Sequence, residues 1–275
     1  MKFDIELVGK IGSMALINKE DKDIDYNIFS RISKELKPGF IWVSSGATEI
    51  GRLDYIKRTG KEIEGNYDEV KTDYAAQGQA ILMQNYRQFA HPSYSIRQVL
   101  VEHQHFNDPD KREHLKGLLL RCGKQNAIPI INYNDAVSFE ENRKMEIQEL
   151  LTEHKKRVVE CVDNDETATQ IACLVKARYL VILTSVDGIY KKPNDLSTLV
   201  TEISGANSDE VLQNIEYYKS LCVGSSRKGS NGAKAKLEYI KEAVIYGATV
   251  KIANAKYKIS DIMSGKAACT TIGIR

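Results

Sequence analysis

The sequence predicts an α/β fold, wound as successive β-α-β units onto a largely parallel sheet. Short apolar runs alternate with longer amphipathic stretches along the whole chain, which is the order that such winding requires. The length of 275 residues exceeds one ordinary domain of about 100 to 200 residues and falls short of two. With 42% hydrophobic and 28% charged residues, the chain has enough apolar material for a sizeable core. We therefore expect one large α/β unit with room for two lobes.

The first half of the chain supplies strands and helices in alternation. Residues 3–9 are an apolar run that predicts the first strand. Apolar residues spaced four apart over 28–36 predict a helix that begins after Asp25 and stops before Pro38. The same reasoning predicts strands at 40–47, 95–102 and 127–137 and helices at 72–90 and 109–125.

The second half contains two passages with weak patterns. Residues 138–162 are charged and irregular, and within them 145–156 indicate either a short exposed helix or a β-ribbon arm. The polar passage 188–232 has a weak helical pattern around 209–219. The clear elements of this half are a helix at 164–177, a strand at 179–186, a helix at 232–247 that ends at Gly247, and a strand at 248–255.

Charge and cysteine content restrict the expected function. The 39 Lys and Arg residues nearly balance the 37 Asp and Glu residues, so at a net charge of +2 we expect no nucleic-acid or membrane partner. An anionic ligand must then be bound by a local arrangement of charges. The five cysteines form no C-x-x-C pair and no zinc-like spacing, so no protein-bound metal is expected. Without a signal segment or an apolar stretch of about 20 residues, a cytoplasmic location is predicted.

Two lysine-containing glycine turns are candidates for binding phosphate. Lys10 lies between two glycines in V-G-K-I-G-S (8–13), directly after the first strand, where an ammonium group can lie along a phosphate. The stretch G-S-N-G-A-K-A-K (229–236) leads into a helix, and the free N–H groups of a helix start favour anions. No Walker A sequence occurs. Taken alone, each string is more typical of a turn with a solvated lysine.

Three further strings place polar residues where a strand ends or a helix begins. V-S-S-G-A (43–47) is a turn rich in N–H and hydroxyl donors, which suits a carboxylate or a phosphate. I-N-Y-N-D-A-V (131–137) ends an apolar run in amides and one carboxylate. V-D-N-D-E-T-A (162–168) brings more polar residues to a helix start than capping requires. A tight connection, an Asx turn and a helix cap are the respective alternative interpretations.

Taken in order, these motifs resemble the amino acid kinase family, and within it the glutamate 5-kinases. The resemblance covers nearly the whole chain and includes A-A-Q-G-Q (75–79), L-T-S-V-D-G-I-Y (183–190) and the closing I-A-N-A turn. It implies a three-layer αβα sandwich, with a single kinase domain over 1–275. The amino-acid-binding lobe would span 1–178 and the ATP-binding lobe 179–275. The RNA-binding-like C-terminal domain of many such kinases is expected to be absent.

The resemblance also implies the reaction. ATP, with magnesium bound through its phosphates, would phosphorylate the side-chain carboxylate of glutamate, which is the first step of proline biosynthesis. The expected partners are the small-molecule amino acid and ATP. Homo-oligomers are common in the family, and the 138–162 stretch is our candidate for an oligomer contact or a lid.

Site residues are implied by their positions in the matching motifs. Lys10 and Lys236 would stabilise the transferring phosphate, and Asp165 would orient both lysines. The amino acid would be held by Ser45, Gly46, Ala47, Asn132, Asp135, Asp163 and Asn164. ATP would be held by Lys10, Gly12, Ser13, Thr184, Ser185, Ser230, Asn231, Gly232, Ala233, Lys234, Ala235 and Lys236.

Several positions differ from the family pattern. The differing residues are Tyr133 for an acidic residue, Ser185 for Asp, Asn231 for Gly, Ala233 for Met and His114 for Asn. The connection from Asp135 to Asp165 is also longer than usual. Two alternatives therefore stay open: a family member that acts on another small acid or a nucleoside monophosphate, and a nucleotide-binding relative that has lost catalysis.

Overall fold

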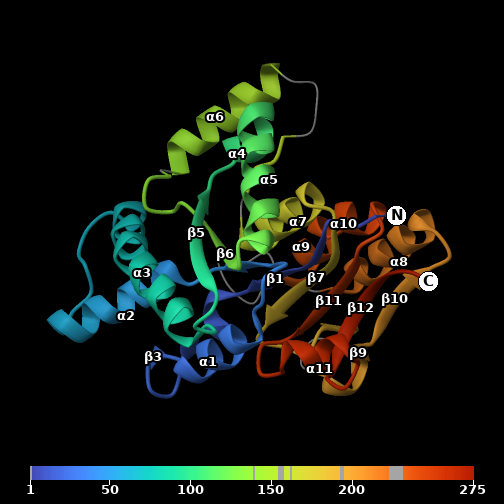
Figure 1. Cartoon of the computed structure of the whole chain (residues 1–275), viewed down its shortest axis with the longest axis horizontal. Coiled ribbons are helices and arrows are strands. Elements are labelled where there is room, and N and C mark those ends of the chain that lie inside the picture. The colour runs from blue at the N-terminus through green and yellow to red at the C-terminus, as the bar shows by residue number, and fades with distance from the viewer. Residues whose placement is uncertain (1, 139, 154–157, 162, 193–194, 223–231) are drawn as a thin grey trace.

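One largely parallel sheet forms the centre of the computed structural model, which describes residues 2–138, 140–153, 158–161, 163–192, 195–222 and 232–275. Within these ranges, eight strands pair in the order β10-β12-β11-β7-β1-β4-β6-β5 (Figure 1). Their bounds are Ile5–Ile11 (β1), Phe40–Ser44 (β4), Ser95–Val101 (β5), Ala127–Tyr133 (β6), Ala177–Thr184 (β7), Glu202–Gly205 (β10), Thr249–Asn254 (β11) and Cys269–Ile274 (β12). Only β11 and β12 pair antiparallel in this sheet. The predicted β-α-β winding is confirmed.

Helices connect most of the strands. They are Tyr26–Glu35 (α1), Ala47–Thr59 (α2), Tyr67–Phe89 (α3), Gln104–Asn107 (α4), Pro109–Lys124 (α5), Glu140–Glu153 (α6), Asn164–Leu174 (α7), Ser208–Leu221 (α8), Gly232–Tyr239 (α9), Lys241–Ile245 (α10) and Ile259–Met263 (α11). Two small hairpins pair Ile17–Asn18 (β2) with Asp23–Ile24 (β3) and Ile189–Tyr190 (β8) with Leu199–Val200 (β9). None of the helices in the described ranges has the length and apolar character that a membrane crossing needs.

The sheet is buried on both faces. Successive residues of a strand point to opposite faces, and Leu7 and Val8 of β1 accordingly belong to two different apolar clusters. The cluster around Val8 includes Ile171 of α7, whereas the cluster around Leu7 includes Phe29 of α1 and Leu82 of α3. Helices therefore cover each face, which confirms the predicted three-layer αβα sandwich.

Several predicted elements differ from the structure for identifiable reasons. The strands expected at 40–47 and 127–137 end at Ser44 and Tyr133, because the chain leaves the sheet where the polar residues begin. Helix α2 was not predicted, since its apolar residues alternate with charged ones. The helix expected at 232–247 is interrupted at Ile240 between α9 and α10.

Helix α6 settles the two interpretations of 145–156 for the residues that the structure describes. These residues are helical up to Glu153, so the β-ribbon interpretation is wrong there, and 154–157 lie outside the described residues. The His103 Nε2 atom is 2.9 Å from Glu146 Oε2, which holds α6 against the start of α4. A role for this arm as a lid or an oligomer contact stays a prediction.

Helices α2 and α3 approach each other through two glycines. A Cβ atom at Gly51 would lie 1.9 Å from the carbonyl oxygen of Tyr74, and one at Gly78 would lie 1.8 Å from the carbonyl oxygen of Ala47. Backbone cannot move aside as a flexible side chain can, so both positions require the absence of a Cβ. This crossing fixes the start of α2, which immediately follows the polar turn after β4.

We expect Gly78→Ala to destabilise the protein although alanine is the better helix former. Helix propensity alone would favour alanine by about 1 kcal/mol, but the overpacked backbone contact should cost about 1–3 kcal/mol or more. Gly117→Ala in α5 is the matched control, because its Cβ would meet only the end of the Arg121 side chain, at 3.0 Å. Urea unfolding should show a loss for the first variant and none for the second. Equal stability of the two variants would contradict the assigned crossing.

Candidate active site

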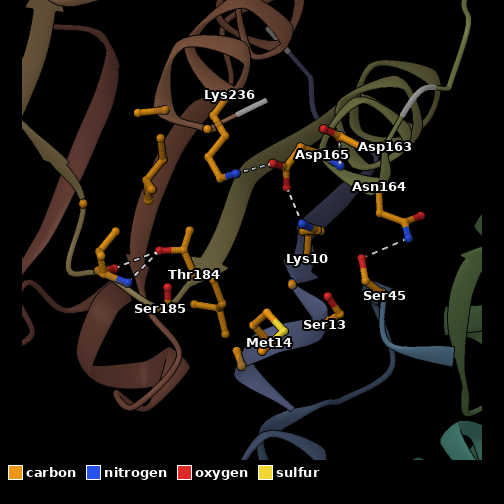
Figure 2. A pocket seen from close by; sticks show the side chains of 18 of the residues that line it. Lys10, Ser13, Met14, Ser45, Asp163, Asn164, Asp165, Thr184, Ser185 and Lys236 are labelled. Carbon is orange, nitrogen blue, oxygen red and sulfur yellow. Dashed lines mark hydrogen bonds and ion pairs between the residues drawn. The ribbon is translucent and has the colours of Figure 1, made fainter. Parts of the chain in front are cut away.

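A cleft of about 530 Å³ opens where β1, β4 and β7 end (Figure 2). β1 pairs in parallel with both β4 and β7, so the three carboxyl ends lie on one edge of the sheet. Ligands of doubly wound sheets bind beyond this edge. The predicted site residues that line the cleft are Lys10, Gly12, Ser13, Ser45, Asp163, Asn164, Asp165, Thr184, Ser185, Gly232, Ala233 and Lys236.

Two lysines from different elements reach one carboxylate in this cleft (Figure 2). Lys10 Nζ, from β1, is 2.5 Å from Asp165 Oδ1, and Lys236 Nζ, from α9, is 2.7 Å from Asp165 Oδ2. The side chains of Asp165 and Lys10 are only 3% and 9% exposed. A single buried carboxylate thus holds two ammonium groups in fixed positions beside the cleft.

The two lysines determine the ionisation of Asp165. Burial alone would raise the pKa of this carboxyl group, but the charges of Lys10 and Lys236 and their hydrogen bonds outweigh burial and lower its pKa to about 2. The group is therefore ionised throughout the physiological range. It can orient the lysines but has little capacity to accept a proton.

Asp163 begins α7 and so positions the residues that follow it. Its side chain accepts hydrogen bonds from the backbone N–H groups of Asp165 at 2.6 Å and Glu166 at 3.1 Å, as an N-cap residue does. The pKa of Asp163 is raised, because burial and the nearby charge of Asp165 outweigh the opposing charge of Lys10. Capping fixes the first turn of α7, from which Asp165 faces the lysines.

Asn164 connects the cleft to the neighbouring strand ends. Its Nδ2 atom donates to Ser45 Oγ and to Asn132 Oδ1, each at 3.0 Å, and the first of these bonds is drawn in Figure 2. Gly46, the residue after Ser45, has a φ of 113°, and a Cβ atom there would also lie 3.0 Å from the Leu16 side chain. This left-handed conformation turns the chain from β4 into α2, which Ala47 begins.

The nucleotide end of the predicted site is formed by the turn after β7. The Thr184 hydroxyl group donates to the Val186 carbonyl oxygen at 2.9 Å and accepts from the Val186 N–H at 3.0 Å. Asn254 Nδ2, at the end of β11, donates to the carbonyl oxygen of Ser185 at 3.1 Å. The Thr184 side chain therefore stabilises this turn, and the Asn254 side chain connects the turn to the neighbouring strand β11.

Some predicted site residues do not line the cleft. Ala47 and Asp135 line a separate cavity of about 20 Å³, Asn132 reaches the cleft only through Asn164, and Lys234 is exposed on α9. Gly46 and Ala235 are also absent from the cleft lining. The predictions for Ser230 and Asn231 lie outside the described residues.

The structure also adds residues that the sequence did not single out. The additional lining residues are Met14, Ala15, Lys19, Leu183, Val186, Gly188, Ile189 and Ile252. Met14 and Ala15 directly follow the predicted glycine turn, and Val186, Gly188 and Ile189 lie within the string 183–190. Proximity to these motifs was therefore an available signal. Lys19 gave no such signal, because a lysine beside a short hairpin is ordinary on a surface.

The fold and the cleft together define a class of protein. Paired lysines, a carboxylate that orients them and small residues at the carboxyl ends of parallel strands form a site suited to phosphate-bearing ligands. The sequence profile of the amino acid kinase family matches residues 6–254. The chain belongs to the amino acid kinase family, and the expected kinase class is confirmed.

Known relatives and solved structures agree with this membership. A glutamate 5-kinase of Alkaliphilus metalliredigens is 30% identical over 260 residues, covering 91% of this chain and 88% of that protein. A glutamate 5-kinase of Streptococcus suis is 29% identical, covering 91% of this chain and 64% of that protein, so the chain spans less than two thirds of this longer relative. One from Geobacillus thermodenitrificans is 29% identical over 98% of this chain and 67% of its own length.

Two solved kinases share the fold at low sequence identity. Carbamate kinase from Giardia lamblia bound to AMP-PNP aligns with a TM-score of 0.58 and 17% identity, covering 98% of both chains. Isopentenyl phosphate kinase from T. acidophilum aligns with a TM-score of 0.55 and 14% identity, covering 98% of this chain and all of that one. These likenesses confirm the amino acid kinase fold.

Proposed function

We propose that this protein transfers the γ-phosphoryl group of ATP to the side-chain carboxylate of glutamate. The observation that carries this proposal is the pair of lysines held by Asp165 in a cleft that Ser45 and Asn164 also line. The similarity to glutamate 5-kinases over most of the chain supports glutamate as the acceptor. The product, glutamyl 5-phosphate, would place the reaction at the first step of proline biosynthesis.

The chemistry needs charge stabilisation more than proton transfer. A free glutamate side chain has a pKa of about 4.3 and is already a nucleophile at neutral pH. One of its oxygens attacks the γ-phosphorus, the bond from that phosphorus to the bridging oxygen breaks, and ADP leaves with the electron pair. Lys10 and Lys236 offset the negative charge of the approaching groups and of the transferring phosphoryl group.

Asp165 acts in this scheme as a positioning residue. Both of its oxygens are engaged by the lysines, and its pKa of about 2 makes it a poor base. Without it, the two ammonium groups would repel each other and turn toward solvent. Its role is to hold them in place before the substrates bind, so that little reorganisation is needed during transfer.

The acceptor and ATP are assigned to opposite ends of the cleft. We assign the acceptor to Ser45, Asp163 and Asn164, which line the cleft, and to Gly46, Ala47, Asn132 and Asp135, which do not line it. We assign ATP to the two lysines and to Gly12, Ser13, Thr184, Ser185, Gly232 and Ala233. We also propose that Ser230, Asn231, Lys234 and Ala235 contact ATP. On this division, 1–178 would be the amino-acid-binding lobe and 179–275 the ATP-binding lobe of one domain.

Magnesium fits this site as an ion that binds together with ATP. In the described part of the chain, no three His, Cys, Asp or Glu side chains are grouped so that they could hold a metal. Both oxygens of Asp165 are paired with lysines, and Oδ1 of Asp163 caps α7. Magnesium would therefore be held mainly by phosphate oxygens, where it would neutralise charge on ATP.

ADP release tests the proposed function directly. Coupled assays should compare glutamate with aspartate, UMP and small phosphonates at equal concentrations. We expect turnover with glutamate to exceed turnover with each of the others. Activity confined to a non-amino-acid acceptor would contradict the glutamate assignment, and tight ATP binding without turnover on any acceptor would favour a non-catalytic relative.

A further inference from the structure

A line of side-chain amides runs from the cleft into the acceptor side of the protein. Asn132, at the end of β6, lies between Asn164 at the start of α7 and Gln79 in α3. Asn164 Nδ2 donates to Asn132 Oδ1 at 3.0 Å, and Asn132 Nδ2 donates to Gln79 Oε1 at 2.9 Å. Three elements that are distant in sequence are thereby joined through one polar line.

The backbone fixes the direction in which each amide points. The Tyr133 N–H donates to Asn132 Oδ1 at 2.9 Å, and a backbone N–H can only donate. The oxygen of Asn132 must face this donor, so its NH₂ group faces Gln79 and requires the Gln79 oxygen. By the same reasoning, Asn164 must direct its NH₂ group toward the Asn132 oxygen. Both outer amides consequently turn their other polar atom away from the line.

Two polar atoms are left open at the ends of this line. Gln79 Nε2, a donor, and Asn164 Oδ1, an acceptor, are both buried and have no hydrogen-bond partner among the described residues. A buried polar group without a partner costs about 1–3 kcal/mol, so native proteins rarely keep one that neither water nor a ligand satisfies. The two open atoms therefore indicate complementary groups on something that binds here.

The surroundings of Gln79 limit the size of its partner. Gln79, Ala47 and Asp135 line the small cavity of about 20 Å³, which is enough for one water molecule or one carboxylate oxygen. Burial raises the pKa of Asp135 in this cavity, and the charges of Lys71 and Arg143 oppose this shift without reversing it. The Gln79 donor requires an acceptor oxygen in this cavity, and the carboxylate of a bound amino acid can supply one.

We propose that Gln79 is a specificity-determining residue whose NH₂ group binds the α-carboxylate of the acceptor. Asn164 Oδ1, at the other end of the line, accepts from the α-ammonium group. The inference rests on the proposed function and deepens it. An open donor and an open acceptor are the hydrogen-bonding complements of the carboxylate and the ammonium group of an α-amino acid.

Paired substrates and a near-isosteric variant test this proposal. 4-Aminobutyrate is glutamate without the α-carboxylate, so wild-type kcat/KM should favour glutamate. Gln79→Glu keeps the oxygen that Asn132 needs but replaces the open donor by an acceptor. It should raise KM for glutamate about 10- to 100-fold with kcat little changed, and it should remove most of the preference over 4-aminobutyrate. Gln79→Met, which adds no charge, should act in the same direction with a smaller increase.

The control is Gln88→Glu, an exposed position near the end of the same helix, which should leave both substrates unaffected. If both Gln79 variants keep the wild-type preference, the cavity holds only water and the inference is overturned. If the wild type phosphorylates aspartate but not glutamate, the proposed function fails. The inference about Gln79 can then still be tested by comparing aspartate with β-alanine, which is aspartate without the α-carboxylate. If it phosphorylates no α-amino acid, both are overturned.

Discussion

Lys10→Met and Lys236→Met are each expected to lower kcat by about 10²- to 10³-fold. Methionine retains most of the length and apolar volume of lysine, so each variant removes chiefly one ammonium group from the transferring phosphate. Asp165 keeps its other lysine in either variant, which should preserve the local structure. Steady-state kinetics with saturating ATP and glutamate measure the effect, together with unfolding curves that verify the fold.

Lys266→Met serves as the control for this pair. Lys266 is exposed beyond the end of α11 and does not line the cleft, so kcat should change by less than a factor of two, about the usual effect of a distant surface substitution. If both cleft variants turned over at the wild-type rate, the phosphate-stabilising role of the lysines would be refuted.

Asp165→Asn should cause the largest loss of stability among the substitutions considered. The change removes the negative charge that lies between two ammonium groups, one of which, Lys10, is almost fully buried. Breaking a buried ion pair by removing one partner costs about 3–5 kcal/mol, so the urea midpoint should fall markedly. Glu6→Gln, which breaks an exposed pair with Lys37, should change stability by no more than about 0.5 kcal/mol.

The same carboxylate predicts how stability depends on pH. The pKa of Asp165 is lowered from 3.8 to about 2 in the folded protein, so the folded state binds this proton more weakly than the unfolded chain does. Its contribution is fully present above about pH 4 and is lost as pH falls toward 2. The stability gap between wild type and Asp165→Asn should therefore be narrower near pH 3 than near pH 6. A gap that widened on acidification would contradict the assignment.

The fold was predictable where local pattern and tertiary environment agree. The stretch 179–186 was predicted as the most apolar strand in the chain, and residues 180–183 of β7 are fully buried in the middle of the sheet. The crossing of α2 and α3 was not predictable in this way. It depends on a contact between Gly51 and Gly78 that neither helix signals by itself, and α2 shows only weak apolar periodicity.

The site was predictable in its charged residues and less so in its geometry. Lys10, Asp165 and Lys236 lie in motifs at strand and helix boundaries, and parallel pairing brings such boundaries to one edge. The sequence could not separate residues that line the cleft from those that do not, because Asn132 and Asp135 share one motif, yet Asn132 only contacts the cleft residue Asn164 and Asp135 lines a separate cavity. The role proposed for Gln79 could not be predicted from the sequence, because its open donor depends on the orientation that the Tyr133 N–H imposes on the Asn132 side chain.

The central claim is that this cleft forms an acyl phosphate on glutamate. Trapping with hydroxylamine tests it most directly, because hydroxylamine converts an acyl phosphate into a hydroxamate that mass spectrometry identifies. With ATP, magnesium and glutamate, we expect the γ-glutamyl hydroxamate in amounts equal to the ADP released, and neither product with Lys236→Met on the same timescale. ADP release without any hydroxamate, or a hydroxamate formed only with a different acid, would contradict the account.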